Sequence, residues 1–135
     1  MTDSIAHNEL LARYVVSSKW FHKEDQTVKQ DAFIPDSFLE LSVTRHLNFS
    51  EDDIWRVGKI IARKISRTLH GRADVETAHV IAQRLNVVPQ PESDNPNHAN
   101  IINWPSDKDA RKMRALEIAR VARFIANPEV ETQIP

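Results

Sequence analysis

The segment Phe38-Leu-Glu-Leu-Ser-Val-Thr-Arg-His46 has the clearest period of two in the chain. Apolar residues alternate with polar ones along it: Leu39, Leu41 and Val43 against Glu40, Ser42 and Thr44. This pattern is typical of a β-strand with one buried and one wet face. Residues 13–21 are rich in β-branched and aromatic residues, and residues 28–34 resume the alternation, with Val28, Ala32 and Ile34 on one face. The three segments together predict an N-terminal antiparallel meander, with Leu39, Leu41 and Val43 facing the core.

Helices are predicted after this meander. Ser50 precedes three acidic residues and an apolar repeat at helical spacing, which favours a helix that Ser50 caps. Asp74 and Ser106 are the expected caps of a second and a third helix. Short strands are expected at residues 87–88 and 98–104. The order predicts an α+β fold, a largely antiparallel sheet with three helices mainly on one face.

The length of 135 residues favours a single domain. Residues 1–12 are expected to form an arm or a short helix, and residues 127–135 a loose tail. The absence of cysteine excludes disulfides and sulfur-ligated zinc. With two glycines, no phosphate-binding glycine loop can be built, and we expect neither a cofactor nor a metal. No signal peptide or membrane span is evident, so we expect a cytoplasmic protein.

Charge is unevenly distributed along a chain whose formal net charge is -1. Residues 54–88 and 108–126 are both locally basic, whereas residues 1–53 are acidic. If the two basic segments lie together, they form a patch that attracts phosphate or an acidic partner. The alternative is that both are ordinary solvated helix faces.

Histidine and arginine residues are the candidates for catalysis. His70 and His98 could act as base and acid, with Arg45 as the charge stabiliser, in metal-free phosphodiester cleavage. Arg72 lies beside His70, and His46 beside Arg45, so both are candidate binding residues. The alternative is structural: such residues commonly hydrogen-bond loop carbonyls.

Two further groups are candidates for binding. Asn97 and Asn100 lie in an asparagine-rich segment that could form a polar lip for a base or a peptide backbone. Trp20 and Phe21 could offer a stacking or partner surface on the sheet. Asparagine in turns and aromatic residues in cores are the corresponding structural interpretations.

Three segments resemble parts of a family of small bacterial proteins with no assigned activity. These segments are Leu41-Ser-Val-Thr-Arg-His46, Arg67-Thr-Leu-His-Gly-Arg-Ala-Asp74 and Asn95-Pro-Asn-His-Ala-Asn-Ile-Ile-Asn-Trp-Pro105. The resemblance implies a bacterial, intracellular protein and assigns no functional residue.

The sequence therefore favours a non-enzymatic binding or adaptor protein. Its partner is expected to be another protein, with a second copy of the same chain and nucleic acid as further possibilities and no membrane. The alternative function is a metal-independent nuclease or phosphoesterase. An oligomeric scaffold is a third hypothesis.

Overall fold

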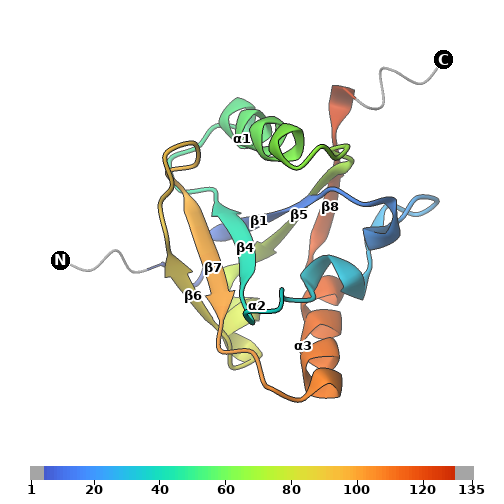
Figure 1. Cartoon of the computed structure of the whole chain (residues 1–135), viewed down its shortest axis with the longest axis vertical. Coiled ribbons are helices and arrows are strands. Elements are labelled where there is room, and N and C mark those ends of the chain that lie inside the picture. Colours follow the sequence, from blue (N-terminus) through green and yellow to red (C-terminus); the bar gives the residue numbers. More distant parts are fainter. Residues whose placement is uncertain (1–4, 130–135) are drawn as a thin grey trace.

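The computed structural model describes residues 5–129, and it has an α+β fold built on a six-stranded antiparallel sheet (Figure 1). The strand order is β6-β7-β4-β1-β5-β8. The bounds are β1 Leu10–Val15, β4 Leu41–Arg45, β5 Gly71–Glu76, β6 Asn86–Pro89, β7 His98–Ile102 and β8 Arg123–Ala126. The prediction of an α+β fold with a largely antiparallel sheet is confirmed.

The predicted N-terminal meander is wrong. β2 (Phe21–His22) and β3 (Thr27–Val28) form a separate two-stranded ribbon. The segment 28–34 alternates in sequence, but most of it forms the short 3-10 helix η2 (Gln30–Phe33), which buries Ala32 and Phe33. Another 3-10 turn, η1 (Ser18–Trp20), breaks the predicted strand 13–21. A β-strand and a short 3-10 helix can both bury apolar residues at this spacing. Alternation alone therefore does not distinguish the two in residues 28–34.

Strand β1 lies inside the sheet and is paired unequally on its two sides. All six of its residues pair with β5, from Leu10 opposite Glu76 to Val15 opposite Gly71. On the other side, only Leu11 and Ala12 pair with β4. Beyond Ala12 the two strands diverge, and Figure 1 shows β1 and β4 running in different directions. This divergence opens the sheet on the β4 side of β1.

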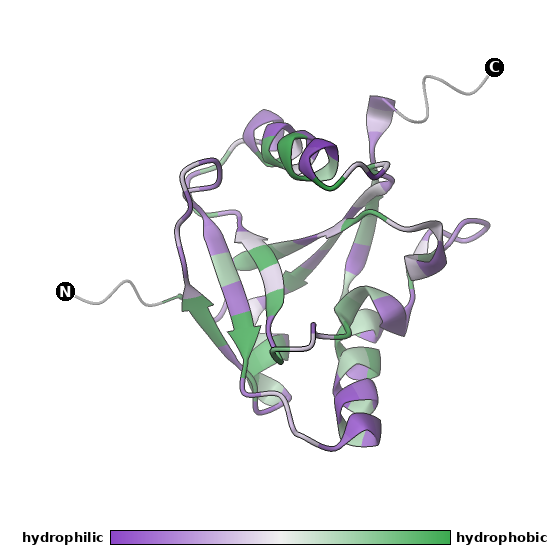
Figure 2. Ribbon diagram, in the orientation of Figure 1, coloured by the Kyte–Doolittle hydropathy of each residue, from purple (hydrophilic) through white to green (hydrophobic). Residues whose placement is uncertain are grey.

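The three helices lie on both faces of the sheet, one on one face and two on the other. Helix α1 (Glu51–Lys64) covers Ala12 and Tyr14 of β1, and its own residues Ile54 and Val57 are buried against them. Its apolar side faces the sheet and its polar side faces solvent (Figure 2). Helices α2 (Thr77–Ala82) and α3 (Lys108–Val121) cover the opposite face.

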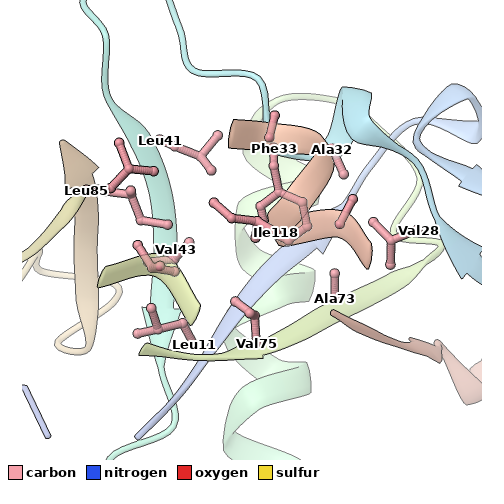
Figure 3. Close-up of a cluster of buried hydrophobic side chains, with 14 of the residues drawn as sticks. Leu11, Val28, Ala32, Phe33, Leu41, Val43, Ala73, Val75, Leu85 and Ile118 are labelled. Carbon is pink, nitrogen blue, oxygen red and sulfur yellow. The ribbon is translucent and has the colours of Figure 1, made fainter. Parts of the chain in front are cut away.

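The larger core lies between that opposite face, α3 and η2 (Figure 3). Leu41 and Val43 are buried in it as predicted, and Leu39 packs against it. Period two in residues 41–45 therefore identified the strand and its inward face correctly.

Of the three predicted helix caps, one is confirmed and two are wrong. Ser50 caps α1 through a capping box with Asp53, as predicted. Asp107, not Ser106, caps α3 by accepting a hydrogen bond from the Ala110 amide at 2.8 Å. Asp74 caps no helix: it is a buried residue of β5, and α2 begins three residues later.

The described parts of the two terminal segments are better anchored than predicted. Residues 10–12 belong to β1, so the described part of segment 1–12 is neither an arm nor a helix there. Asn127 is buried, and its side-chain amide donates to the Leu69 carbonyl at 3.0 Å, which ties down the start of the predicted loose tail. Residues 1–4 and 130–135 of these two segments lie outside the described residues.

Candidate functional site

Three adjoining hollows follow the C-terminal half of α1, where this helix crosses the sheet. The middle hollow shares Ser42, Ile61, Ile65 and His98 with a hollow toward β7. It shares Val16, Trp20 and Ile65 with a hollow that reaches Arg67. We call the three hollows together the α1 groove.

The middle hollow is the smallest of the three, with a volume of about 170 Å³. Its walls are Tyr14 from β1, Val43 and Thr44 from β4, and Ile61 from α1. The hollow exists because β1 and β4 stop pairing after Ala12, so that no backbone fills the space between them. Water occupies about 30 Å³ per molecule, so this volume suits a small side chain or several waters.

Arg13 lies where the two strands separate. Its Nε donates to the Ala32 carbonyl at 2.8 Å, and Nη1 donates to the Ser42 carbonyl at 3.1 Å. The guanidinium carbon lies 4.9 Å from the centre of the Trp20 ring, a cation–π contact. Burial lowers the pKa of Arg13 to about 10, although the charge of Asp36 opposes the shift. The guanidinium remains charged at neutral pH and forms no ion pair with a carboxylate among residues 5–129.

His98 lines both the middle hollow and its neighbour toward β7. Its Nδ1 lies 2.9 Å from the Gln90 carbonyl, and the side chain is only 8% exposed. A carbonyl can only accept, so Nδ1 carries a proton and Nε2 of the neutral ring is an acceptor. Within the described residues Nε2 has no hydrogen-bond partner.

The rim of the α1 groove carries opposite charges at its two ends. Glu40, Glu92 and Asp94 line the end near β7, where Lys64 of α1 forms an ion pair with Asp94. Arg67 lines the other end. Between them Ile65 is half exposed. The groove therefore has a mainly apolar middle, which contains the charged Arg13, between an acidic and a basic end.

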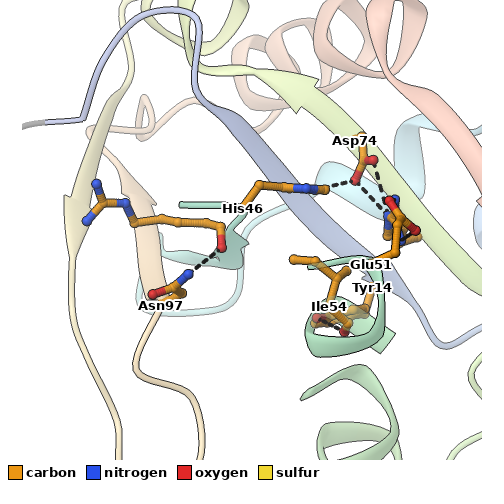
Figure 4. Close-up of polar contacts among 8 residues, drawn as sticks. Tyr14, His46, Glu51, Ile54, Asp74 and Asn97 are labelled. Atoms are coloured by element: carbon orange, nitrogen blue, oxygen red, sulfur yellow. Dashed lines mark hydrogen bonds and ion pairs between the residues drawn. The ribbon is translucent and has the colours of Figure 1, made fainter. Parts of the chain in front are cut away.

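A second polar cluster lies under the first turn of α1 (Figure 4). Arg72 donates to both oxygens of Glu51, at 2.9 and 2.7 Å, and its Nε lies 3.1 Å from both oxygens of Asp74. His46 Nε2 lies 2.9 Å from Asp74 Oδ1. Trp55 stacks on the guanidinium at 4.8 Å. The cluster pins the start of α1 to β5.

The electrostatics of this second cluster are mutually compensating. The hydrogen bond from Arg72 lowers the pKa of Glu51. Burial opposes the charge of Arg72, but its bonds with Glu51 and the charge of Asp74 outweigh burial and raise its pKa. Arg72, Glu51, Asp74 and His46 therefore each have a partner within the cluster.

Tyr14 connects this cluster to the middle hollow. Its hydroxyl donates to the Ile54 carbonyl at 2.6 Å, and Asn95 donates to the Thr44 hydroxyl beside it at 2.8 Å. Burial raises the pKa of Tyr14 above its ordinary value, so the phenol stays protonated. The Tyr14 hydroxyl therefore has a structural role, holding α1 on the sheet.

The predicted catalytic residues are not brought together around one hollow. Arg45 pairs with Leu11, whose side chain is in the core on the α3 side, whereas His98 pairs with Thr44 and lies on the α1 side. Arg45 also forms a bidentate ion pair with Glu9, at 2.7 and 3.0 Å. His70 lies against Phe21, with ring centres 5.4 Å apart. Burial lowers the pKa of His70, with a smaller contribution from Lys23.

The predicted binding residues fall into different places. Trp20 lines the middle hollow, and Asn100 lines the hollow toward β7. Asn97 instead donates to the Arg45 and Leu47 carbonyls, at 2.9 and 2.7 Å, and secures a loop. Phe21 is buried and stacks on Phe124, with ring centres 4.8 Å apart. Arg72 and His46 belong to the compensated cluster.

The two basic segments do not form one patch. The bases of the first are largely on α1, and those of the second are largely on α3, which covers the opposite face of the sheet (Figure 1). Several are also neutralised locally, for example Arg56 by Asp53, Lys59 by Glu129 and Arg120 by Glu117. The two basic segments are therefore separate helix faces on opposite sides of the sheet.

Sequence reasoning singled out His98, Trp20 and Asn100 but missed the groove they line. The missed residues include Ser42, Ile61 and Ile65. Arg13 lines the groove as well, and it is the only charged residue of the segment Leu10–Val15. A strand that is buried on both faces has little reason to keep a charge unless the charge is used.

Among residues 5–129 no group of three or more acidic or histidine side chains is placed to hold a metal ion. Nor does any helix in this part of the chain have the length and apolar character that crossing a membrane requires. Comparison of the chain with protein-family models, with curated proteins and with solved structures gave no match.

Proposed function

We propose that this protein is a non-enzymatic binding protein that holds an extended segment of a protein partner in the α1 groove. The observation that carries the proposal is the continuity of the groove: three hollows share residues along one side of α1. An extended segment spans about 3.3 Å per residue, so a chain of hollows suits successive side chains of one strand-like peptide.

The chemistry of the groove supports a peptide rather than a nucleic acid. Its middle is apolar, through Val16, Trp20, Ile61 and Ile65. Its acidic end would repel a phosphate backbone, whereas a peptide with a basic residue there and an acidic residue toward Arg67 complements both ends. Nucleic-acid binding would require basic residues along the whole path.

The alternative function, a metal-independent nuclease or phosphoesterase, finds no such support. It needs His70, His98 and Arg45 around one substrate, and Arg45 and His98 belong to opposite faces of the sheet. A bacterial origin and a cytoplasmic location stay predictions from the sequence.

A peptide-display selection against the purified full chain tests the proposal. Selected peptides are measured by fluorescence anisotropy against the unmodified protein, Ile65→Asp and Met113→Asp. Both residues are exposed and apolar, at 50% and 57%, but Met113 lies on α3, away from the groove. We expect Ile65→Asp to weaken binding at least about tenfold, the effect of losing one apolar anchor, and Met113→Asp to leave it unchanged.

Two results would contradict the proposal. One is a selection that yields no binding peptide. The other is a set of peptides that Met113→Asp weakens as much as Ile65→Asp. Light scattering on the purified protein shows whether a second copy of the chain occupies the groove. A dimer that is lost in Ile65→Asp would mean that the groove serves self-association.

A further inference from the structure

We propose that the middle hollow of the α1 groove is a carboxylate site, which takes the side chain of an aspartate or glutamate from the bound segment. The inference rests on the proposed function and deepens it, because it names the residue that the partner must present. The guanidinium of Arg13 is the main binding group.

Arg13 has binding capacity left over. A guanidinium has five N–H donors, and two are used on the carbonyls of Ala32 and Ser42. Every other arginine discussed above as buried has a carboxylate partner: Arg72 has Glu51 and Asp74, and Arg45 has Glu9. Within residues 5–129, the acidic group that acts on Arg13 is the more distant Asp36. A shielded cation without a counterion is costly, and an incoming carboxylate would remove that cost.

The surroundings of Arg13 favour an anion. None of the residues that line the middle hollow is acidic. The Ser42 hydroxyl is within reach as a further donor, because Ser42 lines the hollow and, among the described residues, its one hydrogen bond is a long one, 3.5 Å, to Asn100. His98 also lines the hollow, so its ring reports on a bound probe.

Size and position select a carboxylate side chain. The hollow of about 170 Å³ shares lining residues with a further hollow on each side, so a bound chain that follows all three would present a side chain to it rather than its end. A planar carboxylate matches two parallel N–H bonds of a guanidinium. A phosphate would bring nearly two charges to one arginine close to Glu92 and Asp94, which repel it.

NMR titration of the full chain tests the site with small probes. The probes are N-acetyl-glutamate methylamide, its glutamine counterpart and inorganic phosphate, at constant ionic strength. We expect saturable shifts of the Arg13 Nε–H and the His98 ring for the glutamate probe, with affinity about tenfold or more above the glutamine probe, as for a hydrogen bond to a charged group. Equal affinity of the glutamate and glutamine probes, or tighter binding of phosphate, would overturn the proposal.

Three variants distinguish a specific role of the Arg13 guanidinium from a general effect of positive charge on probe binding. Arg13→Gln should abolish the preference for the glutamate probe. Arg13→Lys keeps the charge but loses the planar fork, and should retain only part of the preference. Arg63→Gln, an exposed site on α1 outside the groove, should keep all of it. If Arg13→Gln does not fold, the probe comparison on the unmodified chain still decides the question.

The selected peptides show which of the two proposals has failed, if one does. Peptides that need Ile65 but bind equally well after every Glu→Gln and Asp→Asn change would refute the carboxylate site and leave the groove in place. A glutamate probe that binds at Arg13, in a protein for which no peptide can be selected, would refute the peptide groove and leave the site.

Discussion

Replacing Arg72 by methionine should be among the most destabilising single changes in this fold. Methionine keeps much of the side-chain volume but leaves Asp74, only 7% exposed, without its guanidinium partner. Breaking a buried ion pair in this way costs about 3–5 kcal/mol. The same guanidinium also binds Glu51, whose side chain is 68% exposed. Glu51→Gln should therefore cost no more than about 1 kcal/mol, as for an exposed ion pair.

Urea unfolding followed by circular dichroism measures both changes. With a slope of about 2 kcal/mol per molar urea, Arg72→Met should lower the midpoint by about 1.5–2.5 M and Glu51→Gln by about 0.5 M or less. The double variant Arg72→Met with Asp74→Asn should recover part of the loss, since it no longer buries a carboxylate that has lost its guanidinium partner. Similar urea midpoints for Arg72→Met and Glu51→Gln would refute the view that burial, rather than the number of hydrogen bonds, sets how much each ion pair contributes to the free energy of unfolding.

Other predictions concern the two glycines and His70. A Cβ on Gly71 would lie 2.5 Å from the Ile125 carbonyl oxygen, so Gly71→Ala must displace β8 and should lower stability by about 1–3 kcal/mol in urea unfolding. A Cβ on Gly58 would lie 2.6 Å from Tyr14, but Gly58→Ala should cost less than Gly71→Ala, because alanine regains about 1 kcal/mol of helix propensity. A melting temperature of Gly71→Ala at or above that of the unmodified protein would contradict the first expectation, and a lower melting temperature for Gly58→Ala than for Gly71→Ala would contradict the second. The pKa of His70 is lowered by burial, so the folded state holds its proton less tightly than the unfolded chain. The His70 contribution should reduce stability as pH falls through about 6.5, and His70→Gln should flatten that part of the pH profile; an unchanged slope would exclude it.

Alternation of apolar and polar residues predicts a strand correctly where it reflects the two faces of the sheet and nothing else. In residues 41–45, Leu41 and Val43 face the α3 core while Ser42 faces the α1 groove, so the alternation reflects the two faces of the sheet. In residues 28–34 the same alternation arises from a turn of η2 packed on α3. Period two cannot distinguish these cases, because the difference lies in a distant partner.

Strand β5 was the hardest to predict, for an electrostatic reason. Arg72 and Asp74 look like loop and cap residues in a sequence, because an isolated charge is rarely buried. Here each neutralises the other, and Glu51, from a different element, completes the set. The α1 groove was unpredictable for a related reason: it depends on where β1 stops pairing with β4, which is set by the geometry of both strands.

The central place of β1 has a consequence for how quickly this chain can fold. Its two neighbours, β4 and β5, are separated from it along the chain by dozens of residues, and the register joins Leu11 to Arg45 and to Val75. No tight turn can bring these strands together first, so long loops must close before the middle of the sheet exists. Chains dominated by such distant pairings acquire their structure in milliseconds to seconds rather than microseconds. Folding of this protein should therefore be limited by a slow search for the partners of one short strand.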